Sequence, residues 1–144
     1  MFWSLSSMLA IHGTPGLKLC AKRSRLQPSL VYCDSVLNET ISVLARRAQE
    51  QRRVDQFAGL INALLTEVPT DILVWLSSET QRLYDQVIEL VRSTSGALNF
   101  HDALIALGCQ LLGIEVIASF DSDFDQIAWL TRVGTPEAVM AMFG

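Results

Sequence analysis

Three carboxylic acids lie where they could act together on a metal ion. Glu39 follows a short apolar segment, Asp102 opens an otherwise apolar one, and Asp121 directly follows the apolar residues 115–120. Carboxylates that converge repel one another, and a divalent cation offsets both this repulsion and the cost of burial. Mg²⁺ and Mn²⁺ prefer oxygen ligands, polarise phosphodiesters and convert bound water to hydroxide. The acids therefore indicate metal-assisted hydrolysis.

Each acid also has a purely structural explanation. An acid in the first turn of a helix stabilises it through the helix dipole, and Asp is a common turn residue after a strand. Asp102 is the strongest functional candidate, because residues 102–112 are nearly all apolar and are expected to be buried. A calcium loop over 121–132 is excluded, because Gln126 and Arg132 replace the required Gly and Glu.

Alternating strands and helices are expected to position these acids. The apolar runs predict strands over 29–33, 71–76 and 115–120, with 127–133 as a short continuation. Helical spacing predicts helices over 2–11 and 17–26, from Asp34 or Ser35 to the arginine-rich run near 50, and over 54–65, 77–91 and 102–112. Such alternation predicts an α/β fold with a parallel sheet covered by helices, in which ligands bind at strand ends. We expect one domain over 1–144.

The composition excludes disorder, since 50% of the 144 residues are hydrophobic and 18% are charged. The net charge of −4 is divided unevenly. Residues 1–28 contain four basic residues and no acid, so the remaining seven basic and fifteen acidic residues give −8. An acidic body argues against binding nucleic acid by charge alone, but is compatible with a nucleic-acid enzyme whose carboxylates hold metal.

The cysteines and the opening segment bear on the compartment. Three cysteines without a C-x-x-C spacing predict reduced, buried thiols in a cytoplasmic protein. The apolar start is much shorter than the ~20 residues of a membrane span and lacks a basic leader region, so no membrane association is expected. We expect Trp3, Trp75 and Trp129 to lie in the core.

Two segments resemble the PIN-domain family. The run LVYCDSVLNETISVLARR (30–47) is similar to the family's second strand and following helix, and matches its acid with Glu39. The run LNFHDALIALGCQLLGIEVIASFDSDFDQI (98–127) is similar to the C-terminal half. There Asp102 and Asp121 match two further acids, and Asp123 falls where some members carry an additional one. The resemblance covers roughly residues 29–130.

This resemblance implies a three-layer sandwich and an Mg²⁺- or Mn²⁺-dependent ribonuclease. Many members are VapC-type toxins of toxin–antitoxin pairs, and they commonly dimerise. It further implies an RNA substrate, an antitoxin protein and a second copy of the chain as partners. The implied roles are metal binding for Glu39, Asp102, Asp121 and Asp123, orientation of the acids for Ser119, and contact with the RNA backbone for Arg46 and Arg47.

One departure from the family concerns its first acid, which ends the first strand. This chain has no acid before Asp34, so we expect that strand to be absent and residues 1–28 to be atypical or truncated, through either an internal start at Met1 or divergence of the N-terminus. Loss of the acid would weaken the metal site. Two other functions therefore stay open: a PIN module that binds RNA or a protein without cutting, and an unrelated α/β protein with scattered acids.

Overall fold

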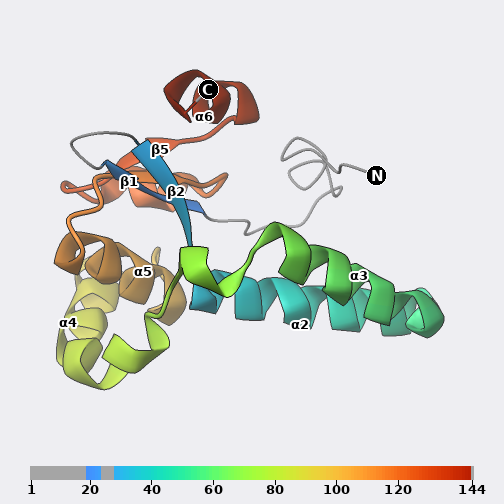
Figure 1. The fold of residues 1–144 in the computed structure, drawn as a ribbon. Helices are drawn as coiled ribbons and strands as arrows, with labels where there is room; N and C mark the ends of the chain where they lie inside the picture. The colour runs from blue at the N-terminus through green and yellow to red at the C-terminus, as the bar shows by residue number, and fades with distance from the viewer. Residues whose placement is uncertain (1–18, 24–27, 144) are drawn as a thin grey trace.

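The computed structural model describes residues 19–23 and 28–143 (Figure 1). The strands are β1 (Leu19–Arg23), β2 (Pro28–Cys33), β3 (Leu73–Val74), β4 (Val116–Ala118) and β5 (Thr131–Val133). The α-helices are α2 (Asp34–Glu50), α3 (Val54–Glu67), α4 (Thr80–Ser93), α5 (Phe100–Leu111) and α6 (Pro136–Phe143), with short 3₁₀ turns η1 (Thr70–Ile72), η2 (Ser77–Glu79) and η3 (Ser122–Gln126). The helix expected over 2–11, and Trp3, lie outside the described residues. Within them, no helix is long and apolar enough to cross a membrane.

The five strands form one sheet in the order β3-β2-β1-β4-β5. Strand β2 is parallel to β3, and β4 is parallel to β5, as the alternating pattern predicted. Strand β1 is antiparallel to both β2 and β4, so four strands run in one direction and the central strand runs in the other. Only four residues separate β1 from β2, which permits a hairpin but not the long crossover that parallel neighbours need.

Strand β1 corrects two expectations. A basic helix was predicted over 17–26, but residues 19–23 form the central strand. A strand was not expected before residue 29, yet β1 fills the middle of the sheet between β2 and β4. Its sequence, LCAKR, contains no acid. The central strand of the sheet therefore contributes no carboxylate.

Alternation along the strands divides the core between the two faces of the sheet. Cys33 and Ile117 join a cluster that includes buried residues of α4 and α5. Their neighbours Tyr32 and Ala118 join a second cluster with residues of α2, α3 and α6. Successive strand residues point to opposite faces, so each face receives its own layer of helices. The α/β sandwich predicted from the sequence is confirmed.

Helix α5 forms the buried centre of the first cluster, where eight successive residues from Asp102 to Cys109 are buried. It begins at Phe100 and is capped by Asn99, whose side chain accepts a hydrogen bond from the Asp102 amide. It ends before Gly113, which has a φ of +66° as expected of a helix-ending glycine.

Three features differ from the sequence prediction. Trp75 is 56% exposed rather than buried, whereas Trp129 is partly buried and its indole N–H donates to the Ala106 carbonyl. Helix α6 was not predicted. Strand β3 is only two residues long, because Asp71 and Ile72 of the expected strand belong to the 3₁₀ turn η1.

Candidate active site

The pairing of the strands identifies the edge at which Asp34 and Asp121 lie. One row of paired residues crosses the whole sheet, namely Leu73, Tyr32, Leu19, Ala118 and Val133. Asp34 is two residues beyond this row on β2, and Phe120 is two residues beyond it on β4. Asp34 and the segment Ser119–Asp121 therefore leave the sheet at the same edge, where parallel α/β sheets bind ligands.

Asp102 lies in the first turn of α5 and is 3% exposed. Its amide donates to Oδ1 of the capping residue Asn99 over 3.0 Å. A carboxylate at this end of a helix is stabilised by the positive end of the helix dipole. Apolar packing along α5 fixes the position of the Asp102 backbone. The burial predicted for this acid is observed.

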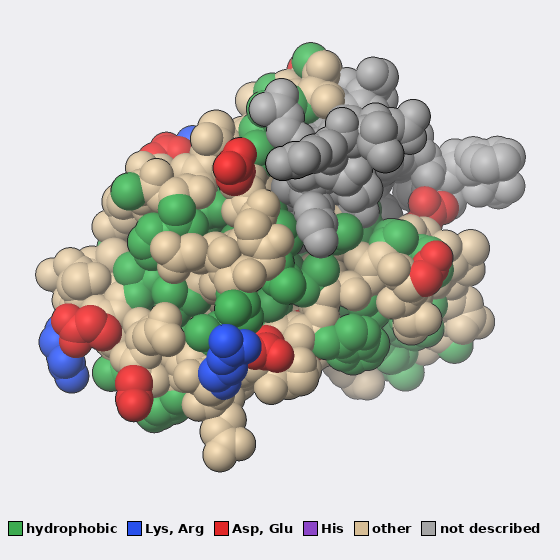
Figure 2. Space-filling model, turned by 60° about the vertical axis from the view of Figure 1, so that its left-hand side comes forward, with side chains coloured by type: hydrophobic (Ala, Val, Ile, Leu, Met, Phe, Trp, Pro, Cys, Tyr) green, Lys and Arg blue, Asp and Glu red, His purple; other side chains and the backbone are tan. Residues whose placement is uncertain are grey.

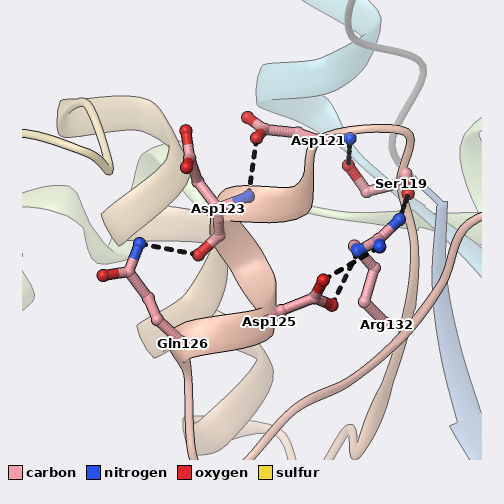
Figure 3. Close-up of polar contacts among 6 residues, drawn as sticks. All are labelled: Ser119, Asp121, Asp123, Asp125, Gln126 and Arg132. Carbon is pink, nitrogen blue, oxygen red and sulfur yellow. Dashed lines mark hydrogen bonds and ion pairs between the residues drawn. The ribbon is translucent and has the colours of Figure 1, made fainter.

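Asp121 caps the short turn η3 and lies two residues after the buried Ser119 (Figure 3). The Asp121 amide donates to Oγ of Ser119 over 3.1 Å, and Oδ1 of Asp121 accepts from the Asp123 amide over 2.9 Å. Ser119 thus orients the backbone of Asp121 through a hydrogen bond. Asp123 is exposed on the same turn.

Arg132, on β5, binds this turn from the neighbouring strand. Its Nη1 donates to the Ser119 carbonyl over 3.0 Å, while Nε and Nη2 donate to the two carboxylate oxygens of Asp125 over 2.8 and 2.9 Å. The hydrogen bonds from Arg132 hold the pKa of Asp125 below its ordinary value of 3.8. The Asp125 hydrogen bond and the nearby Asp121 charge raise the pKa of Arg132.

Asp34 is a buried acid whose role sequence reasoning missed. Asp34 begins α2 as expected, but Cys33 occupies the N-cap position, and no side-chain hydrogen bond caps this helix. The Asp34 carboxylate, 2% exposed, instead accepts hydrogen bonds from the amides of Leu76 and Ser77 over 2.7 and 3.1 Å. It therefore fastens the end of β2 to the segment after β3. The signal available in the sequence was an acid directly after an apolar strand.

The remaining candidates lie along α2. Glu39, in the second turn, and Arg46 are exposed, and Arg47 is half-buried. Next to Asp34, Oγ of Ser35 is buried without a hydrogen-bond partner among the described residues.

The PIN-domain family model matches residues 8–130 of the 144-residue chain. The chain belongs to the PIN-domain family. No curated protein and no solved structure matches it. PIN domains are in general nucleases that use divalent metal ions.

Whether this PIN domain suits such an ion depends on its donors. Asp102, Asp121 and Asp123 offer carboxylate oxygens, the ligands that Mg²⁺ and Mn²⁺ prefer. The described part of the chain has no group of three or more His, Cys, Asp or Glu side chains that could hold a metal. The structure thus does not bring Glu39, Asp102 and Asp121 into one ligand set. Mg²⁺ commonly keeps several waters and takes only one or two carboxylates, so the donor chemistry fits a sparsely held ion.

Proposed function

We propose that this PIN domain is an Mg²⁺- or Mn²⁺-dependent endoribonuclease. The observation that carries the proposal is Asp102, a buried carboxylate at the start of an apolar helix in a chain of this family. A carboxylate at this end of a buried helix supplies the oxygen donor that Mg²⁺ and Mn²⁺ prefer. Asp102 and Asp121 would hold the ion, as a sparsely held Mg²⁺ takes only one or two carboxylates. When bound, the ion would polarise the phosphodiester and lower the pKa of a water.

The other residues of the turn would keep Asp121 in place. Oγ of Ser119 accepts from the Asp121 amide, and Oδ1 of Asp121 is already directed by the Asp123 amide. The first contact fixes the backbone of Asp121 and the second fixes its side chain before substrate arrives. A prearranged carboxylate stabilises developing charge without reorganisation during the reaction.

Two exposed aromatic side chains favour single-stranded RNA as the substrate. Trp75 is 56% exposed and lies two residues beyond Leu73, and Phe120 is 50% exposed and lies two beyond Ala118. Both therefore leave the sheet at the edge of the candidate acids, on strands three spacings apart, or about 14 Å. Unpaired bases stack on aromatic rings, each contact worth about 1–3 kcal/mol.

Binding of the phosphates would depend on a few arginines. Figure 2 shows a face on which acidic side chains outnumber basic ones, in keeping with the acidic composition. General attraction of RNA is therefore weak there. Arg46 and Arg47 of α2 would supply local positive charge for the backbone.

The proposal extends to the biological setting that the family suggests. PIN-domain nucleases often pair with antitoxins, and we propose a cytoplasmic toxin that forms a homodimer. Exposed apolar side chains on α3 support a contact with a second copy or an antitoxin, namely Val54, Leu60 and Leu65. Light scattering of the purified chain should give twice the mass of 15.9 kDa. A monomeric mass at micromolar concentration would contradict the homodimer.

A second candidate function is a PIN module that binds RNA without cutting it. It is favoured by the lack of an acid in β1 and by the lack of a three-ligand group among the described residues. Fewer carboxylates weaken the hold on the metal and the activation of water.

RNA binding and RNA cleavage, measured on the same preparation, separate the two functions. A fluorescent single-stranded RNA is titrated with the chain in EDTA, and cleavage is then started with Mn²⁺ or Mg²⁺. The nuclease proposal predicts cleavage that EDTA abolishes and that Asp102→Asn loses. Binding without cleavage in either metal would favour the non-cleaving module.

A further inference from the structure

The turn that carries Asp121 and Asp123 is held at both ends by one side chain. Arg132 contacts the Ser119 carbonyl before the turn and both carboxylate oxygens of Asp125 near its end (Figure 3). The Arg132 side chain is 19% exposed. The arginines of the other two described ion pairs, Arg82 and Arg92, are 68% and 71% exposed. The Arg132 hydrogen bond to the Ser119 carbonyl is partly buried, whereas the Asp125 side chain is 55% exposed, so the ion pair itself is open to water and to screening by salt.

The fold directs the guanidinium to this place. Arg132 lies opposite Ile117 in the parallel pair of β4 and β5, and its neighbour Val133 is buried in the second core cluster. Alternation along β5 therefore sends Arg132 to the other face of the sheet. Gly134 leaves room for it, because a methyl group at that position would collide with Nη1 of Arg132.

We propose that Arg132 is a positioning residue, which fixes Asp121 by holding the segment Ser119–Asp125 at both ends. The effect of Arg132 on cleavage rests on the proposed nuclease function. Five successive residues of this segment include three acids, namely Asp121, Asp123 and Asp125. Their mutual repulsion would open the turn, and a fixed guanidinium offsets that repulsion while its planar fork sets the geometry.

This geometry requires an arginine, because a positive charge alone would not reproduce it. The guanidinium donates through Nε, Nη1 and Nη2 to acceptors on two sides of the side chain. A lysine ammonium is a compact charge that cannot reproduce the planar fork. Arg132→Lys should therefore keep the charge and lose part of the hold on the turn.

The test compares Arg132→Gln, Arg132→Lys and Gly134→Ala with the wild type and with Arg92→Gln. The control Arg92→Gln removes an exposed ion pair on α4. Gly134→Ala keeps every charge but displaces Nη1. Amide hydrogen exchange is measured by NMR for Asp121 and Asp123, whose N–H groups are hydrogen-bonded within the turn. Cleavage is measured as kcat and KM well below each variant's unfolding temperature.

The proposal predicts exchange of these two amides about tenfold faster in Arg132→Gln, with unchanged exchange in α5. Smaller changes of the same kind are predicted for Arg132→Lys and Gly134→Ala, and none for Arg92→Gln. It predicts a lower kcat with unchanged KM in Arg132→Gln, partly restored in Arg132→Lys. Unchanged exchange at Asp121 and Asp123, or a kcat equal to the wild type, would overturn it. If the wild type does not cleave, the nuclease proposal fails separately and the exchange result alone decides the role of Arg132.

Discussion

Oδ1 of Asp34 accepts a hydrogen bond from the Leu76 amide over 2.7 Å, although 42 residues separate them along the chain. This buried contact joins the end of β2 to the segment that follows β3. Together with Ser77, which donates to Oδ2, it fixes the segment next to Trp75 at the edge of the candidate acids. The arrangement of this edge thus depends on an acid whose two carboxylate oxygens both accept hydrogen bonds from backbone amides.

Replacement of Asp34 by Asn should destabilise the fold. The amide keeps one oxygen acceptor but presents an NH₂ group to a backbone N–H, which is left buried and unpaired. Hydrogen bonds to charged groups contribute about 1.5–3 kcal/mol, so we expect the free energy of unfolding to fall by about 2–3 kcal/mol. Urea unfolding followed by circular dichroism measures this. The exposed acid Asp71 is the control, and an equal loss in Asp34→Asn and Asp71→Asn would contradict the assignment.

A methyl group at Gly108 should also destabilise the fold. In α5 this glycine lies against the Leu76 side chain, and an added Cβ would collide with Cδ2 of Leu76. Overpacking of a filled core costs about 1–3 kcal/mol. Gly59, in α3, has no atom within 4 Å of an added Cβ. We therefore expect Gly59→Ala to stabilise by about 0.5–1 kcal/mol through helix propensity. Equal midpoints for the two variants in urea would show that α5 and Leu76 are not closely packed.

Tyr32 should make stability depend on pH in the alkaline range. Burial, and secondarily the charge of Glu67, raise the pKa of its hydroxyl above the ordinary value of 10.0. The unfolded chain then releases this proton at lower pH than the folded chain. The contribution of Tyr32 is fully present below pH 10 and is lost as pH rises through the folded pKa. Tyr32→Phe should thus lose less stability between pH 9 and about 11. Parallel profiles of unfolding free energy against pH for wild type and Tyr32→Phe would refute the prediction.

Arg46 offers a test of phosphate contact. Its side chain is exposed on α2, so its removal should change binding more than folding. Each phosphate contact to single-stranded nucleic acid contributes about −0.7 to the slope of log affinity against log salt. We expect Arg46→Ala to weaken RNA binding and to reduce this slope by about that amount. Arg92→Ala, on α4, is the control. A slope that does not change would remove Arg46 from the RNA interface.

The parts of the fold that follow from local pattern were predicted well. The continuous apolar run predicted helix α5, and the strand before Asp121 lies within one or two residues of its expected bounds. Strand β1 was missed because its basic residues suggest a solvated helix. Its pairing depends on contacts with β2 and β4 rather than on its own sequence.

The candidate site was predictable only in part. The burial of Asp102 followed from the apolar helix around it, and the position of Asp121 followed from the strand before it. The roles of Asp34 and Arg132 were not predictable, because their partners Leu76 and Ser119 are brought to them only by the tertiary fold. Trp75 was expected in the core because it lies in an apolar run, yet it falls just beyond a two-residue strand and is exposed to solvent.

Metal-dependent cleavage of RNA, measured for the wild type beside Asp102→Asn, tests the central claim most directly. A labelled single-stranded RNA is incubated under single-turnover conditions with Mn²⁺ or Mg²⁺, with EDTA and Asp71→Asn as controls. We predict that wild type and Asp71→Asn cleave at the same rate. Asp102→Asn should be more than about 100-fold slower, because loss of even an outer-shell partner costs 10–100-fold. Equal cleavage by all three proteins, or none by the wild type in either metal, would contradict the claim that this chain is a nuclease acting through Asp102.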